Sequence, residues 1–298
     1  MSTVLTKKST ETPWPDLSDD LRMLRESVSI KVSRNVRQGY QKDENTRGMY
    51  RSGVKLNVER NRLLTESYKV TEGEPMVLRR AKALSHILRN MSIFIVPNSR
   101  IVGHSGSTPN DLYYPIEINW KSPWRAMNSD DARNILDDEG RTEMEKIVEY
   151  WKGKTLSDLR KNVFKGDLEK YFKFEGTFLW SHWDEGAVPN FEKLFKIGLK
   201  GLRKEAEERL QEVIDTIPDN YLDQHDFLQG VLISLDAAVD FARRYAERAR
   251  EDAAKENGPE RKKELEEIAK ICDRVPENPP ETLHEALQFF WFISLIKG

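Results

Sequence analysis

The stretch that decides the fold is Pro279-Pro-Glu-Thr-Leu-His-Glu-Ala-Leu-Gln-Phe-Phe-Trp-Phe-Ile-Ser-Leu-Ile296, near the end of the 298-residue sequence. Thr282 and Glu285 have the spacing of a capping box, which predicts that a helix begins there. In the apolar run that follows, only Gln288 and Ser294 are polar. A helix that is apolar on all sides must be enclosed, and this one is too short to cross a bilayer. We therefore expect further polypeptide to cover it and interpret the chain as the front part of a larger protein.

Apolar residues recur at intervals of three and four along much of the remaining sequence. This spacing predicts helices over 56–68, 76–88, 191–217, 227–250 and 259–272. The run Ile93-Phe-Ile-Val96, bounded by Pro97, is interpreted as a short buried strand. The predicted fold class is therefore mainly α.

The ends and breaks of the sequence suggest how it is organised. Residues 1–17 are polar and contain Pro13 and Pro15, which is typical of a flexible leader. We assign residues 18–298 to one helical portion. Residues 103–128 have the composition of a loop, but their tyrosines and tryptophans predict that it packs against the protein. The proline-rich break at 276–280 is compatible with a tight turn and with a domain boundary.

Composition excludes several functional classes. The 48 basic and 50 acidic residues nearly balance, so no net field favours nucleic acid or an anionic membrane. The single cysteine excludes an internal disulfide. No signal peptide or long apolar span is recognisable, so we expect a cytoplasmic protein.

Common catalytic motifs are missing from the sequence. The histidines are far apart, and none belongs to an HExxH unit, so we expect no metal site. Gly103 to Gly106 lacks the further residues of a phosphate-binding loop. Cys272 has the apolar spacing of its helix, which favours a packing role over a nucleophilic one.

The most unusual local sequence is Phe178-Leu-Trp-Ser-His-Trp-Asp-Glu-Gly-Ala-Val-Pro-Asn190. Aromatic walls with a few polar groups are what a small-molecule pocket requires. An equally good interpretation from the residues alone is a loop whose aromatic side chains fill a surface crevice. Spacing gives no acid or base role to the histidine and the two acids of this loop.

Several blocks of the sequence, in order, resemble the pyruvate formate-lyase-like glycyl radical enzymes. The blocks are Glu59-Arg60, Thr65-Glu-Ser-Tyr68, Glu72-Gly-Glu-Pro75, Leu78-Arg-Arg-Ala81, Ile101-Val-Gly103, and the series from Ile271-Cys272 through Pro279-Pro280 to Trp291-Phe292. The matches span about residues 50 to 298. Within the family, Gly53 through Ser67 most resembles benzylsuccinate synthase, the fumarate-adding branch.

The resemblance implies the helical N-terminal part of a ten-stranded α/β barrel, with most of the barrel outside this chain. It implies a lyase or synthase that uses thiyl-radical hydrogen abstraction on a small organic substrate. The family's radical glycine and catalytic cysteine are not in this sequence, so we expect the chain alone to contribute no catalytic residue, to bind no cofactor and to be inactive. A separate radical S-adenosylmethionine activating enzyme would install the glycyl radical, and the complete protein would be a homodimer.

The resemblance also favours the pocket interpretation of the aromatic loop. The candidate substrate-pocket residues are Trp180, His182, Trp183, Asp184 and Glu185. The two indoles suit an aromatic substrate. Relatives that dehydrate polyols or cleave choline tend to have a Gly-His block before the proline. This sequence instead has Glu185-Gly-Ala-Val-Pro189, which argues against a small-polyol dehydratase.

Other functional hypotheses remain open. Within the family, the alternatives are an arylacetate decarboxylase or a dehydratase. Outside it, the chain is either one subunit of a split enzyme, whose partner carries the cysteine and glycine, or a noncatalytic helical binding module.

Overall fold

The computed structural model describes residues 55–107, 111–128, 136–163 and 188–297. Internal contacts divide the chain between Gly53 and Val54, and all described residues belong to the second part. The expected leader at 1–17 lies outside the described residues.

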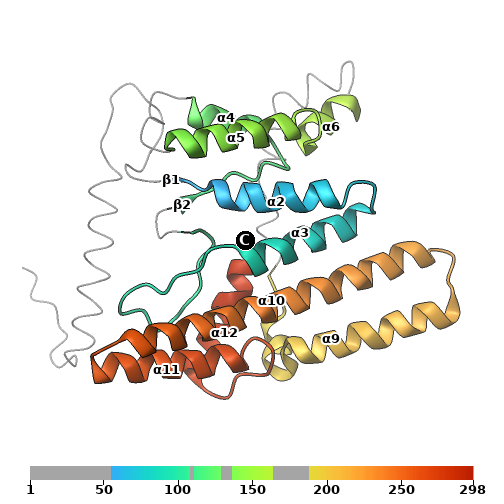
Figure 1. The fold of residues 1–298 in the computed structure, drawn as a ribbon. Coiled ribbons are helices and arrows are strands. Elements are labelled where there is room, and N and C mark those ends of the chain that lie inside the picture. Colours follow the sequence, from blue (N-terminus) through green and yellow to red (C-terminus); the bar gives the residue numbers. More distant parts are fainter. Residues whose placement is uncertain (1–54, 108–110, 129–135, 164–187, 298) are drawn as a thin grey trace, which may run out of the picture. The chain divides into compact units, whose positions relative to one another are not determined.

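The described part is mainly helical, as predicted (Figure 1). Its elements are β1 (Lys55–Leu56), α2 (Val58–Val70), α3 (Met76–Asn90), β2 (Asp111–Leu112), α4 (Lys121–Met127), α5 (Asp138–Trp151), α6 (Leu156–Val163), α9 (Phe191–Thr216), α10 (Tyr221–Lys255), α11 (Pro259–Arg274) and α12 (Leu283–Lys297). The two short strands pair in parallel, with Lys55 opposite Asp111 and Leu56 opposite Leu112.

Helix α10 is the central element. Its 35 residues extend for about 52 Å, and it packs against α3, α9 and α11. Small side chains repeat along its buried face at intervals of three and four, and let the neighbouring helices approach closely. These residues are Ala238, Ala242, Ala246, Ala249 and Ala253.

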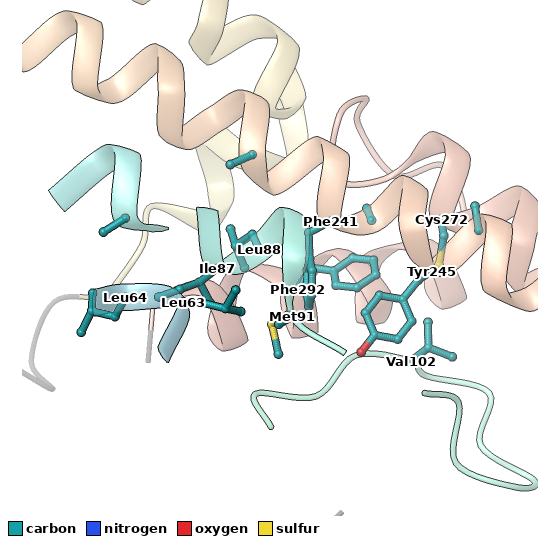
Figure 2. Packing of buried hydrophobic residues seen from close by; sticks show 14 of the residues in the cluster. Leu63, Leu64, Ile87, Leu88, Met91, Val102, Phe241, Tyr245, Cys272 and Phe292 are labelled. Atoms are coloured by element: carbon teal, nitrogen blue, oxygen red, sulfur yellow. The ribbon is translucent and has the colours of Figure 1, made fainter. Parts of the chain in front are cut away.

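The main hydrophobic cluster, which we call the α10 core, surrounds this face and draws on α2, α3, α4, α5, α10, α11 and α12. Figure 2 shows part of it. Phe241 and Tyr245 of α10 meet Phe292 of α12 there. The predicted packing role of Cys272 is confirmed, because it lies in this cluster with 2% of its surface exposed. Burial raises the pKa of its thiol.

The predicted helices are present with changed boundaries, and the predicted strand is wrong. Residues 93–96 have an irregular conformation and are only half-buried. They lack the complete burial that a run of four apolar residues predicts. Helices α5 and α6, which lie within residues 138–163, were not predicted from the sequence. The break at 276–280 is a turn inside the second part of the chain.

The capping box at the start of α12 is confirmed. The amide of Glu285 donates to Thr282 Oγ1 at 3.2 Å, and the amide of Thr282 donates to Glu285 Oε2 at 3.2 Å. The described residues cover only one face of the helix, where Gln288, Phe289 and Phe292 are buried. Its opposite face carries four exposed apolar side chains, namely Leu283, Leu287, Phe290 and Trp291.

Candidate functional site

The predicted pocket residues Trp180, His182, Trp183, Asp184 and Glu185 all lie outside the described residues. Their assignment to a substrate pocket remains a prediction. The structure describes the chain again from Val188, and therefore shows how the residues that follow this segment in the sequence are held.

The chain that follows the predicted pocket enters α9 through an N-cap. Asn190 Oδ1 accepts a hydrogen bond from the amide of Lys193 at 3.0 Å. Phe191 and Phe195 then pack against α12, with ring centroids 4.8 Å from Phe290 and 5.4 Å from Phe289, respectively. These contacts hold the beginning of α9 on α12.

A second, smaller hydrophobic cluster lies under this contact, and we call it the α9 seat. Its buried members are Leu194, Leu199, Ala238, Ile271, Val275 and Phe289. Phe191 and Phe195 pack against it as partly buried residues. The seat therefore joins the first turns of α9 to α10, α11 and α12.

An open hollow of about 300 Å³ lies beside the seat. It is lined by Asn190, Glu192, Lys193, Lys196 and Ile197. Both lysines already have carboxylate partners, since Lys193 Nζ lies 2.5 Å from Glu205 Oε2 and Lys196 Nζ lies 2.7 Å from Glu192 Oε1. The lining has little uncompensated charge with which to select an anion.

The loop before β2 is hydrogen-bonded to α12 through the side chain of Gln288, a polar residue within the apolar run of that helix. Gln288 Oε1 accepts from the amide of Val102 at 2.8 Å, and Gln288 Nε2 donates to the carbonyl of Val102 at 2.7 Å. All three groups are buried, so this pairing satisfies backbone groups that water cannot reach. It explains why a glutamine interrupts the apolar run.

Neighbouring loop residues are held in the same way. Trp291 Nε1 donates to the carbonyl of Gly103 at 3.0 Å, and the amide of His104 donates to the hydroxyl of Tyr245 at 3.1 Å. Gly103 has φ +122°, and a Cβ atom there would lie 2.7 Å from Leu295 Cδ1. This backbone conformation favours glycine, and a Cβ atom would also force the end of the Leu295 side chain to move. The Ile101-Val-Gly103 block thus has a structural role at α12.

A small cavity adjoins this loop. Arg60, His104, Ser105 and Tyr113 supply its polar lining. The guanidinium of Arg60 lies 4.4 Å from the centroid of the Tyr113 ring, a cation–π contact. With a volume of about 20 Å³, the cavity holds about one water molecule. It is too small to be a substrate pocket by itself.

A buried carboxyl that sequence reasoning missed lies in the loop after β2. Burial raises the pKa of Glu117, while its own backbone amide, Arg60 and Arg80 act in the opposite direction. Its Oε2 is buried and has no hydrogen-bond partner in the described part of the chain. A carboxyl in these surroundings can hold a proton at a higher pH than an exposed one. Nothing in its sequence context, Pro-Ile-Glu-Ile, signals this property.

The described residues also bear on metal binding and membrane insertion. Within them, no three His, Cys, Asp or Glu side chains come together as metal ligands. Among the described helices, none combines the length and hydropathy that a bilayer crossing needs.

Comparison with known proteins identifies what this scaffold resembles. The chain is 33% identical over 264 residues to isethionate sulfite-lyase of Nitratidesulfovibrio vulgaris. This alignment covers 81% of this chain and 31% of the relative. Its fold matches the B12-independent glycerol dehydratase from Clostridium butyricum with a TM-score of 0.78 and 27% identity, over 96% of this chain and 35% of that one.

A glycyl radical enzyme from Archaeoglobus fulgidus matches with a TM-score of 0.68 and 30% identity, over 82% of this chain and 32% of that one. The chain therefore spans about a third of the length of these proteins. The pyruvate formate lyase-like family matches residues 22–297, nearly the whole sequence. The chain belongs to the pyruvate formate lyase-like family.

Proposed function

We propose that this chain is the N-terminal helical part of a glycyl radical lyase or dehydratase that acts on a small organic substrate. One observation carries the proposal. The chain matches the glycerol dehydratase over 96% of its length, with a TM-score of 0.78 and sequence identity of 27%. Agreement in fold and sequence over the same residues is stronger support than either alone.

The matches bear on the branch of the family. The names of the matched proteins, a sulfite-lyase and a glycerol dehydratase, support a small polar substrate and favour the dehydratase alternative over an aromatic synthase. The benzylsuccinate branch stays a prediction. The replacement of the Gly-His block by Glu185-Gly186 then implies a changed pocket within a lyase or dehydratase scaffold.

We assign to the described helices the task of supporting the pocket segment that contains Trp180, His182, Trp183, Asp184 and Glu185. The exposed apolar face of α12 would pack against the barrel formed by the rest of the protein. Leu283 and Leu287 are 78% and 50% exposed in this chain, so covering them would contribute favourable burial.

The radical chemistry would come from a glycine and a cysteine outside these 298 residues. Cys272 does not fit the role of the radical-bearing thiol, because its side chain is packed in the α10 core and only 2% exposed. A radical S-adenosylmethionine activating enzyme is the partner that this proposal requires, and the complete protein would be a homodimer.

The test is to read the parent gene past the codon for Gly298 and to express its product anaerobically with an activating enzyme. We expect the reading frame to continue into a cysteine loop and a glycine loop. We also expect an organic-radical signal by electron paramagnetic resonance after activation. Isethionate, glycerol and 1,2-propanediol should be offered beside indoleacetate and toluene with fumarate, so that the product identifies the branch.

The alternatives give different results in the same experiment. A stop codon after Gly298 together with a co-purifying chain that carries both radical residues would support the split enzyme. A stop codon with no partner and no radical signal would contradict the proposal and favour the binding module.

A further inference from the structure

Helix α9 changes direction at Gly198, within the stretch that joins the predicted pocket to the α9 seat. Gly198 has φ 64° and ψ −179° inside an otherwise helical segment. A Cβ atom there would lie 2.4 Å from the carbonyl oxygen of Glu277 and 2.8 Å from the carbonyl carbon of Asn278. Both the backbone conformation and the lack of space restrict this position to glycine.

The two backbone amides that follow the bend donate hydrogen bonds to carbonyl groups outside the helix. Leu199 donates to the carbonyl of Pro276 at 3.0 Å, and Lys200 donates to the carbonyl of Glu277 at 2.9 Å. In a continuous helix these amides would bind carbonyls four residues earlier in α9. Helix α9 therefore consists of a short first part, residues 191–197, and a long second part, residues 199–216, that begins on the 276–277 turn.

The turn that receives these amides is itself fixed. Glu277 Oε2 accepts from Arg243 of α10 at 2.7 Å, and the amide of Asn278 donates to the carbonyl of Arg274 of α11 at 2.8 Å. The bend is thus attached to the two helices that form much of the α10 core. Its position therefore depends on helices α10 and α11.

The first part of α9 is held from its other side by α12. Phe191 and Phe195 contact Phe290 and Phe289, respectively. The ion pair between Lys193 and Glu205 joins the two parts of the helix across the bend. The direction of residues 191–197 consequently determines where Val188 to Asn190 lie, and these residues lead directly from the predicted pocket.

We propose that Gly198 is a positioning residue, which sets the direction of residues 188–197, the stretch that follows the predicted pocket segment in the sequence. Its consequence for the pocket rests on the proposed function. The bend itself does not, because every contact that defines it lies within the described residues. A side chain at position 198 would force α9 to straighten or to move away from the 276–277 turn.

The first experiment measures the bend directly. Spin labels at Glu192→Cys and Glu208→Cys lie on the two parts of α9, and both parent residues are exposed. Buried Cys272 should remain unlabelled. A straight helix would place the two positions about 24 Å apart. We expect a shorter, narrow distance in the parent chain, and a longer or broader one after Gly198→Ala.

Gly230→Ala in α10 is the matched control. A Cβ atom there would meet its nearest neighbour, Ala81 Cβ, at an ordinary 3.5 Å, so the labelled distance should not change. If Gly198→Ala fails to fold, Phe290→Ala serves as a second variant, because Phe290 is 46% exposed and its loss should be tolerated. It removes the contact of Phe191 with α12 and should broaden the same labelled distance. A narrow, parent-like distance in the folded variant would overturn the proposal.

The second experiment asks whether the bend reaches the pocket. Fluorine NMR of the fluorotryptophan-labelled chain reports on Trp180 and Trp183, with Trp151 of the α10 core as an internal reference. We expect Gly198→Ala to shift the first two resonances and to leave that of Trp151 unchanged. A changed distance without these shifts would overturn the positioning role, whereas the proposed radical function is judged separately by the radical signal and the product.

Discussion

The α10 core and the α9 seat differ in how their residues are held. The α10 core collects side chains from seven helices, and its central aromatic residues, Phe241, Tyr245 and Phe292, are at most 1% exposed. The α9 seat has few buried members, and Phe290, which contacts Phe191 beside the seat, is 46% exposed. Local opening costs less where fewer apolar contacts are lost. We therefore expect the global stability of the chain to depend on the α10 core. We expect the placement of the predicted pocket segment to depend on the α9 seat.

The largest expected effect is in the α10 core. Phe241→Ala should lower the free energy of unfolding by about 3–5 kcal/mol, because it leaves a cavity among rigidly packed helices. Phe195→Ala in the partly buried rim of the seat should cost about 1–2 kcal/mol. Urea unfolding of both variants measures the difference. Equal losses would show that the two regions are one stability unit.

The next effect tests the attachment of the loop to α12. Gln288→Leu leaves the buried amide and carbonyl of Val102 unpaired, so we expect a loss of about 2–4 kcal/mol. Ser294→Ala is the control, since it changes the other polar residue of the apolar run and should cost less than about 0.5 kcal/mol. Thermal unfolding compares the two. If Gln288→Leu were neutral, the pairing would not stabilise the chain.

Two N-caps sharpen the comparison between the regions. Asp137 Oδ1 accepts from the amide of Gly140 at 2.8 Å at the start of α5, which packs in the α10 core. Asp137→Ala should lower global stability by about 1 kcal/mol. Asn190→Ala should mainly speed hydrogen exchange in residues 191–197, because Gly198 separates them from the rest of α9. A purely global effect of Asn190→Ala would contradict that separation.

The smallest effects concern two carboxyl groups whose pKa values are shifted in opposite directions. Burial raises the pKa of Glu117 above 4.5, so its stabilising contribution is complete below 4.5 and is lost as the pH rises through the raised value. Glu117→Gln should remove this decline and make the chain more stable at neutral pH. Unfolding free energies measured between pH 4 and pH 8 test this, and an unchanged pH profile would contradict the assignment.

Glu66 provides the contrast. Partial burial acts to raise its pKa, but hydrogen bonds from His86 and Arg62 lower it below 4.5. Its contribution is therefore present above 4.5 and is lost as the pH falls through the lowered value. Glu66→Gln should slightly reduce stability at neutral pH, by the small amount typical of exposed ion pairs. A gain in stability would contradict the inferred interactions.

Much of the helical framework was predictable from local patterns. The three-and-four spacing located α2, α3, α9, α10 and α11, because each helix buries one face and that periodicity is written in the sequence. The capping box located the start of α12 for a similarly local reason. The strand predicted over 93–96 was wrong because a short apolar run does not reveal whether a neighbouring strand exists to pair with it.

The candidate site was less accessible to the same reasoning. The pocket residues from Trp180 to Glu185 were chosen from their types and from the family resemblance, and they stay predictions. Gln288 was visible as an interruption of an apolar run, but its partner Val102 is 186 positions away. Gly198 lies inside the helix predicted over 191–217 and could not be singled out from the sequence, because the backbone that forbids a side chain there comes from residues 277 and 278.

The sequence by itself determined the mainly helical class, the start of α12, the packing role of Cys272 and the family. Each of these depends on residue type, local spacing or the order of short blocks, which require no knowledge of distant contacts. Only the tertiary structure decided why Gln288 is polar, why positions 103 and 198 favour glycine, and why the Glu117 carboxyl holds its proton more tightly. These properties arise where segments far apart in the chain bring backbone groups and charges together, and burial then sets their energies.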